Sequence, residues 1–327
     1  MARSRVVENP ALGRPLRTGP LDELGVPTDR LALRAFAAGD ADGAAELVRH
    51  VATEAEWSLV SYSQWIDGLL AHAAAELPGF AAHHAALEDV AGPFVPTVPG
   101  DRLAAAAHAA ALAAVAGGDP TALRAALDAM RAAYRARNDA YSDWAWGLLT
   151  ALRAELGEAR LEAAFRASMQ GWRSERYAAL GRLSPREVFE LALESTRPLL
   201  GGRAGEGDVD VTEDDEKWVL SFDPCGTGGR MRRSARSEPP FGFADVEGAY
   251  DWTWGEAGVC LFCAHCSFVN EIVPIEQHGT PMRVTEYPDA PGKPCTWTVY
   301  KAPERVPDRA FERVGKRRGD QPSRGGS

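Results

Sequence analysis

The first 224 residues of this chain contain no cysteine, and all five cysteines lie between Cys225 and Cys295. Long apolar runs are also missing. The longest stretch of low polarity, residues 103–118, is mostly alanine and is too short and too weakly apolar to span a bilayer. The first ten residues lack the apolar core of a signal peptide. These absences predict a cytoplasmic protein without membrane contact.

An excess of basic residues is absent as well. The chain has 46 acidic and 36 basic residues and a formal net charge of −10. Nucleic acids and anionic lipids are bound by basic faces, so neither is expected as the main partner. A small molecule is the partner that we expect, and a homodimer is compatible with the sequence. The length of 327 residues fits about two domains.

The pattern from residue 29 to residue 203 predicts an all-helical bundle. Asp119 followed by Pro120 is typical of a helix start, and apolar residues recur behind it at helical spacing until Gly157. Ser184 and Glu187 form a capping box that opens another helix. Residues 1–28 are rich in Pro, Gly and Arg without periodicity, and we expect a disordered arm there.

The character of the chain changes after a glycine-rich linker at residues 201–207. Alternating apolar residues on both sides of the acidic stretch 213–216 predict a β-hairpin. Further strands are expected at 282–287 and 296–300, with a short helix at 267–277. The expected fold class is therefore α+β: a helical bundle, then a small antiparallel α+β metal-binding domain (207–305) and a disordered basic tail (306–327).

Three of the cysteines lie in one run, Gly258-Val-Cys-Leu-Phe-Cys-Ala-His-Cys266. The spacing brings the sulfurs of Cys260, Cys263 and Cys266 round one point, which a thiophilic metal requires and ordinary packing does not. In the cytosol, clustered cysteines are more often ligands or redox groups than disulfides. The run therefore predicts a metal site, and the alternative is three small buried cysteines that bind nothing.

A fourth ligand has to come from a distance. Cys225 is our first choice and Cys295 our second, because each follows a proline and sits on rigid, extended backbone. His265 and His278 are nitrogen alternatives. The predicted metal ligands are thus Cys225, Cys260, Cys263 and Cys266.

Zinc is the metal that we expect, held in a closed tetrahedron or by three ligands and a water. An iron–sulfur cluster also suits C-x2-C-x2-C with a remote fourth cysteine. The familiar bacterial run continues with x3-C-P, whereas here Cys266 is followed by Ser-Phe-Val-Asn. Because of this difference, zinc is the first expectation and the iron–sulfur cluster is the alternative.

Cys225-Gly-Thr-Gly-Gly-Arg230 has two interpretations. The glycines either make room at a metal site or, with Arg230 as a bidentate donor, form an anion pocket. The spacing is not G-x-G-x-x-G, so a nucleotide fold is not supported. Arg232, Arg233 and Arg236 are expected in a solvated loop.

Candidates for proton transfer follow the cysteine run. Glu276 and His278, and Glu271 before them, could act as general base beside a metal-bound water. In the helical half, His50/Glu54 and His84/Glu88 are spaced i, i+4, which places each pair on one helix face. Without the Glu-x-x-His pairs of di-iron bundles, we assign no metal to them.

The last hundred residues resemble a known type of domain. Gly258-Val-Cys260, a helical segment, Gly279, the strand 281–287 and Gly292-x-x-Cys295 before a final strand follow one another in order. This order resembles the small α+β domains of the vinyl-reductase and aminothiazoline-carboxylate hydrolase type. The resemblance implies a ligand-binding domain that uses cysteines for metal, and it covers residues 207–301.

Together these features predict a zinc-binding hydrolase or lyase that acts on a small anionic molecule. Arg230 would orient the anion, and Glu276 or His278 would move protons. One alternative is a non-catalytic small-molecule-binding or interaction module with a structural four-cysteine zinc. The other alternative is an iron–sulfur redox protein.

Overall fold

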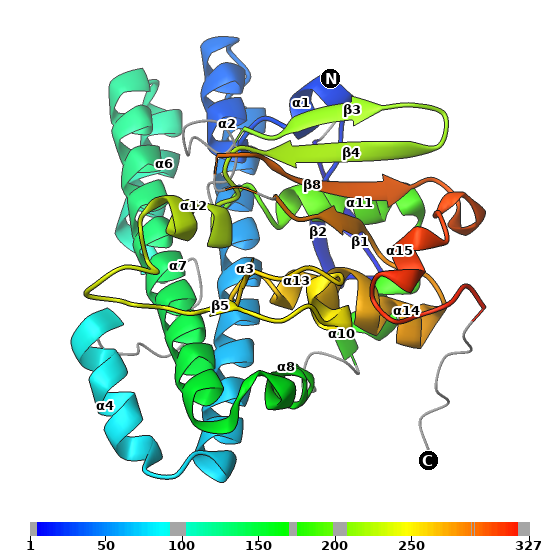
Figure 1. Cartoon of the computed structure of the whole chain (residues 1–327). Helices are drawn as coiled ribbons and strands as arrows, with labels where there is room; N and C mark the ends of the chain where they lie inside the picture. Colours follow the sequence, from blue (N-terminus) through cyan, green and yellow to red (C-terminus); the bar gives the residue numbers. More distant parts are fainter. Residues whose placement is uncertain are drawn as a thin grey trace.

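The computed structural model describes residues 5–91, 103–169, 175–198, 208–288, 290 and 292–319. Its N-terminal part is a layer of long helices in which α3 (Ala41–Glu76), α6 (Ala105–Gly117) and α7 (Pro120–Leu156) pack against one another (Figure 1). The helices α2 (Thr28–Ala37), α4 (Phe80–Ala91) and α8 (Leu161–Ser168) pack on this layer. The helical character expected for residues 29–203 is confirmed for the described part.

Local signals set the ends of these helices. The Asp119 carboxylate accepts hydrogen bonds from the N–H groups of Thr121 and Ala122, and α7 ends at Gly157, where φ is +78°. The capping box at Ser184 and Glu187 opens α11 (Pro185–Glu194). Shorter helical elements complete this half: α1 (Leu21–Leu24), η1 (Glu158–Arg160) and α10 (Glu175–Leu180).

The C-terminal part is built on a four-stranded antiparallel sheet with the order β3-β4-β8-β7. Its strands are β3 (Asp210–Glu213), β4 (Lys217–Phe222), β7 (Val284–Glu286) and β8 (Cys295–Tyr300). The predicted hairpin around residues 213–216 and the two later strands are thus confirmed. Together with the helical layer they make the fold α+β, as expected.

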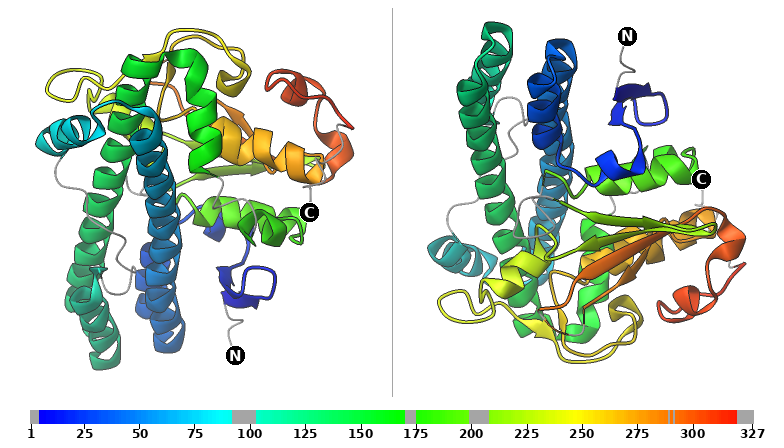
Figure 2. Two further views of the ribbon diagram at one scale, coloured as in Figure 1. Left: turned by 90° about the horizontal axis from the view of Figure 1, so that it is seen from below. Right: turned by 90° about the horizontal axis from the view of Figure 1, so that it is seen from above.

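Helices cover both faces of this sheet (Figure 2). On one face α11 packs Phe189 and Leu193 against Trp218, Leu220 and other apolar side chains of the sheet. On the other lies a continuous helical run made of α13 (His265–Ser267), the π-helix η4 (Phe268–Ile272) and α14 (Val273–His278). The remaining elements are β1 (Val6–Asn9), β2 (Arg14–Arg17), α12 (Gly228–Arg233), β5 (Asp245–Val246), η3 (Asp251–Thr253), β6 (Val259–Cys260), η5 (Pro303–Arg305) and α15 (Arg309–Glu312).

Two segments expected to be disordered belong to the fold. Residues 5–28 form the hairpin β1-β2 and α1, and buried Arg17 fixes them by donating to the carbonyls of Leu24 and Val26. Residues 306–319 include α15, and Arg313 donates to Glu271 at 2.7 Å. The first expectation rested on missing periodicity and the second on a basic, polar composition. Neither property reveals short elements that are held in place by arginine hydrogen bonds. Residues 1–4 and 320–327 lie outside the described residues.

One hydrophobic core joins the helical layer to the C-terminal part. Trp65 of α3 stacks on Phe165 of α8, which in turn stacks on Phe268 of η4 at 5.0 Å between ring centroids. Tyr62 stacks on Phe262 from the cysteine run. The cysteine run is therefore held between the helices and the sheet. Within the described residues, no helix has the length and apolarity needed to cross a membrane.

A close approach between two helices gives a first prediction. A Cβ added at Gly68 of α3 would lie 2.3 Å from the carbonyl oxygen of Ser168 at the end of α8. We expect Gly68→Ala to lower the free energy of unfolding by about 1–3 kcal/mol, because backbone has to move. The control is Gly117→Ala in α6, where no atom lies within 4 Å of the new Cβ. That change should stabilise the protein by about 0.5–1 kcal/mol in urea unfolding. Equal effects in the two variants would contradict the prediction.

Candidate functional site

Four cysteines line one cavity of about 100 Å³ between α3 and the C-terminal part. They are Cys225, Cys263, Cys266 and Cys295. One wall comes from a single face of α3, and its residues are Trp57, Ser58, Ser61, Tyr62 and Trp65. Trp254, Phe262, Tyr287 and Trp297 add further aromatic walls. The cavity therefore joins segments that are far apart in the sequence.

The sheet and the cysteine run bring these thiols together. Cys295 begins β8 opposite Phe222 of β4, and the chain leaves β4 directly into Cys225, so both thiols lie at the same end of the sheet. Cys263 lies in the turn after β6, and Cys266 is in α13. None of the five cysteines is part of a disulfide. Cys260, in β6, is fully buried and does not line the cavity.

Glycines make room for two of the sulfurs. A Cβ at Gly228 would lie 2.2 Å from the Sγ of Cys263, and one at Gly229 would lie 3.1 Å from the Sγ of Cys225. The N–H of Gly229 donates to the Sγ of Cys225 at 3.0 Å. Cys-Gly-Thr-Gly-Gly thus lets the backbone approach two thiols, which favours the first of its two interpretations.

The thiols also influence one another. Burial, reinforced by the neighbouring Cys225, raises the pKa of the Cys266 thiol to about 12. A hydrogen bond with Cys260, followed by burial, raises the pKa of Cys263 well above its ordinary value. Burial does the same for the pKa of Cys295. A bound metal ion reverses this effect, because it stabilises the thiolate form.

The sulfurs are not gathered as one zinc ion would hold them. With Zn–S bonds of about 2.3 Å, a tetrahedral ion holds its sulfurs roughly 3.8 Å apart. Every cysteine belongs to the described part of the chain. In that part, one group of three potential metal ligands lies within 4.8 Å of one another, and this group contains no cysteine. The ligand set Cys225, Cys260, Cys263 and Cys266 stays a prediction. Binding one zinc ion would require the cysteine segments to move closer together.

Two arginines give the cavity positive charge. Arg283 is 8% exposed, its Nε donates to the Oδ1 of Asn270 at 2.6 Å, and its guanidinium lies 3.9 Å from the ring centre of Trp297. Arg232 stacks over Tyr287. Burial lowers the pKa of Arg283 to about 10, so it remains charged at neutral pH. Within the described residues, no Asp or Glu lines the cavity and neither arginine forms an ion pair.

The structure places the predicted anion-binding residue elsewhere. Arg230 pairs with Asp139 of α7 and does not line the cavity. Arg232, expected in a solvated loop, lines it instead, and Arg236 binds Asp143 at 2.9 Å. Successive side chains of helix α12 point in different directions, and the sequence alone does not show which of them face the cysteines.

Glu276 and His278 also lie away from the cysteines. Glu276 pairs with Arg166 at 3.0 Å and with Lys316 at 2.8 Å, and the His278 ring lies 2.9 Å from the carbonyl oxygen of Tyr177. Neither lines the cavity. Because a general base must reach the proton that it abstracts, these residues are not placed for the predicted role. They tie α14 to neighbouring segments.

Glu271 is buried behind the cavity. It accepts from Trp254 at 2.8 Å and from Arg313 at 2.7 Å. His265 does line the cavity, with its Nδ1 2.6 Å from the carbonyl of Phe262 and its Nε2 3.6 Å from the Sγ of Cys266. Burial lowers the pKa of His265 to about 4, which keeps the ring neutral.

Sequence reasoning missed Arg283, although a signal for it exists. Arg283, Thr285 and Tyr287 alternate along β7 and its flanks, and all three line the cavity. A buried arginine on the same strand face as a buried threonine and a half-buried tyrosine is unusual, because charged side chains are rarely buried. Period-two alternation could therefore have identified this face.

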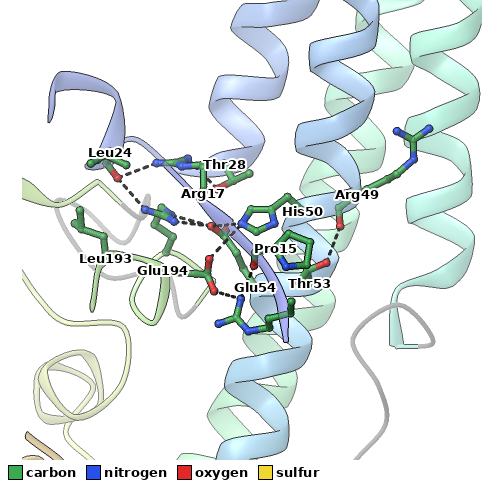
Figure 3. Close-up of polar contacts among 12 residues, drawn as sticks. Pro15, Arg17, Leu24, Thr28, Arg49, His50, Thr53, Glu54, Leu193 and Glu194 are labelled. Carbon is green, nitrogen blue, oxygen red and sulfur yellow. Dashed lines mark hydrogen bonds and ion pairs between the residues drawn. The ribbon is translucent and has the colours of Figure 1, made fainter. Parts of the chain in front are cut away.

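A second cluster of potential ligands lies on α3 and α11. The Nε2 of His50 is 3.2 Å from Glu194 and 3.5 Å from Glu54, and these residues point toward one another (Figure 3). His50 and Glu54 are one of the two i, i+4 pairs seen in the sequence. The side chain of Glu88, in the other pair, lies outside the described residues.

Arginines already neutralise this cluster. Arg197 donates to Glu54 at 2.7 and 3.0 Å, and Arg14 lies 2.5 Å from Glu194. Burial alone would raise the pKa of Glu194, but the hydrogen bond from His50 and the charge of Arg14 outweigh it and lower this pKa. A cation would have to displace both arginines. The cluster is therefore better explained as a buried ion network that ties α3, α11 and β2 together.

Removing one arginine tests this explanation. Arg197→Met leaves the Glu54 carboxylate buried without its counter-charge, so the free energy of unfolding should fall by about 3–5 kcal/mol. The control is Arg160→Met, which breaks the exposed pair with Glu76 and should cost about 0–1 kcal/mol. Urea unfolding with and without chelator measures both. A loss of stability with chelator in the wild-type helical layer would point to a metal at His50 instead.

The position of Glu276 makes stability depend on pH. Burial would raise its pKa, but the hydrogen bond from Lys316 and the charge of Arg166 outweigh it, so the pKa lies below the ordinary 4.5. A lowered pKa stabilises the fold above pH 4.5, and this stabilisation disappears as the pH falls through the folded value.

Glu276→Gln should therefore lower stability at pH 7 by up to about 1 kcal/mol and have little effect near about pH 3. Unfolding midpoints at both pH values measure this difference. Glu304→Gln, which makes the same charge change at an exposed residue, is the control. A pH-independent difference for Glu276→Gln would show that the carboxylate is not stabilised by its partners.

Comparison with known proteins adds no family to these observations. No protein-family model, curated protein or solved structure matches the chain. The resemblance to vinyl-reductase and aminothiazoline-carboxylate hydrolase domains therefore stays a prediction. The cavity with its cysteines and arginines is the feature from which function has to be argued.

Proposed function

We propose that the cysteine-lined cavity holds a thiolate-bound metal centre and that the protein is a cytoplasmic iron–sulfur redox protein. The observation that carries this proposal is the convergence of four thiols and two arginines without ion-pair partners on one cavity. When bound, such a cluster supplies one-electron chemistry. The iron–sulfur protein, the last of the alternatives drawn from the sequence, is thus the one that the geometry supports best.

The spacing and the volume both favour a cluster over a single ion. One ion occupies far less than the cavity volume of about 100 Å³. The iron atoms of a cluster are themselves separated, so their cysteine sulfurs lie farther apart than those on one zinc ion. No three of the cysteine sulfurs lie within 4.8 Å of one another, and this fits the wider spacing of the ligands of a cluster.

The surroundings suit a buried redox centre. Aromatic side chains from α3 and from the cysteine run line the cavity, and the four thiols are partly buried beside them. Low exposure, nearby charge and hydrogen bonds to sulfur set the reduction potential of such centres. The N–H of Gly229 already donates to the Sγ of Cys225.

A second candidate is the hydrolase or lyase that the sequence predicted. The two arginines favour it, because they could hold a small anionic molecule beside a zinc ion with one open position. In this case Arg283 and Arg232 take the role expected for Arg230. This candidate lacks a carboxylate base at the described part of the cavity wall, which leaves neutral His265 as the nearest group for proton transfer.

Metal analysis with an absorption spectrum tests the proposal. Full-length protein purified without oxygen should contain iron and acid-labile sulfide and should absorb visible light, with bleaching on reduction. Cys263→Ser should lose most of the iron and the absorption, because binding energy at such sites is also folding energy. One zinc per chain without visible absorption would support the second candidate. Protein that retains neither metal after reconstitution would contradict both.

A further inference from the structure

We infer that Cys225, Cys263, Cys266 and Cys295 are the ligands of the metal centre, and that Cys260 is not a ligand, because four thiols face one cavity beside Arg232 and Arg283 while the fifth does not. This assignment replaces one member of the C-x2-C-x2-C run by a cysteine 29 residues beyond its end (295 − 266). It rests on the proposed function for the metal but not on which metal is bound.

The backbone places Cys260 just outside the lining of the cavity. It pairs with Asp245 in the short ladder of β5 and β6, and its N–H donates to the hydroxyl of Tyr287 at 2.9 Å. Its side chain is fully buried beside Cys263 and does not line the cavity. Cys260 is thus placed to support a ligand as a positioning residue.

The sheet holds Cys295 at the cavity. Its pairing with Phe222 places it beside the chain that leads into Cys225. Trp297, two residues further along β8, lines the cavity on the same side of the strand.

The charge of the cavity fits four thiolates. A metal centre with four thiolate ligands is an anion, and burying an anion without a counter-charge is costly. Arg283 is deeply buried, is held by Asn270 and Trp297, and forms no ion pair with any described carboxylate. Arg232 lies on the cavity near Cys263. Together they supply the positive charge that this ligand set requires.

Two matched substitutions test the assignment in the full chain. Iron, acid-labile sulfide and zinc are measured in Cys295→Ser and Cys260→Ser, each purified without oxygen beside the wild type. Cys295→Ser should lose the metal, with an affinity lowered by at least about 100-fold, since even an outer partner costs 10–100-fold. Cys260→Ser should keep the wild-type metal content and spectrum.

Circular dichroism in the near ultraviolet checks that the variants are folded. If Cys260→Ser does not fold, Cys260→Ala takes its place, because alanine needs no hydrogen-bond partner. Wild-type metal content in Cys295→Ser overturns the assignment on its own, and so does metal loss from a folded Cys260 variant. A wild-type protein that binds no iron, sulfide or zinc would instead overturn the proposed function, and the two failures are therefore distinguishable.

Discussion

The contact between α3 and the cysteine run is the constraint on which the site depends. Trp65 lies 5.5 Å from Phe262 and 4.9 Å from His265 between ring centroids, and Tyr62 stacks on the same phenylalanine. Aromatic contacts of this kind add to the free energy of simple burial. They fix a turn that has little regular structure of its own. Without the α3 wall, the thiols of this turn would face water.

Buried arginines organise the molecule in two different ways. At the N-terminal hairpin, Arg17 and Arg197 are saturated by carbonyl groups and by Glu54, so their charge is used within the fold. At the cavity, Arg283 is held only by neutral groups, and no described carboxylate pairs with its charge. The same residue type therefore serves structure in one place and, in the proposed function, provides charge for a ligand in the other.

Local signals in the sequence predicted local structure well. Asp119, Ser184 and the acidic turn at 213–216 each act within a few residues, and the expected helices and hairpin are present. The site could be predicted only in part. The cysteines were identified as a group, but which of them share a cavity depends on how β8 pairs with β4 and how α12 rests on α7. These contacts join residues about 70 to 90 positions apart, and no local pattern reports them.

The misplaced candidates have the same physical origin. Arg230, Glu276 and His278 were chosen because they lie near the cysteines in the sequence, yet each is engaged by a helix from the other half of the chain. Arg283, by contrast, approaches the thiols only after the sheet has formed. Proximity along the chain is a poor guide where a short strand or a single helical turn sends neighbouring side chains to opposite sides. A functional assignment for such a protein has to rest on the charge and the donor atoms that the finished cavity presents.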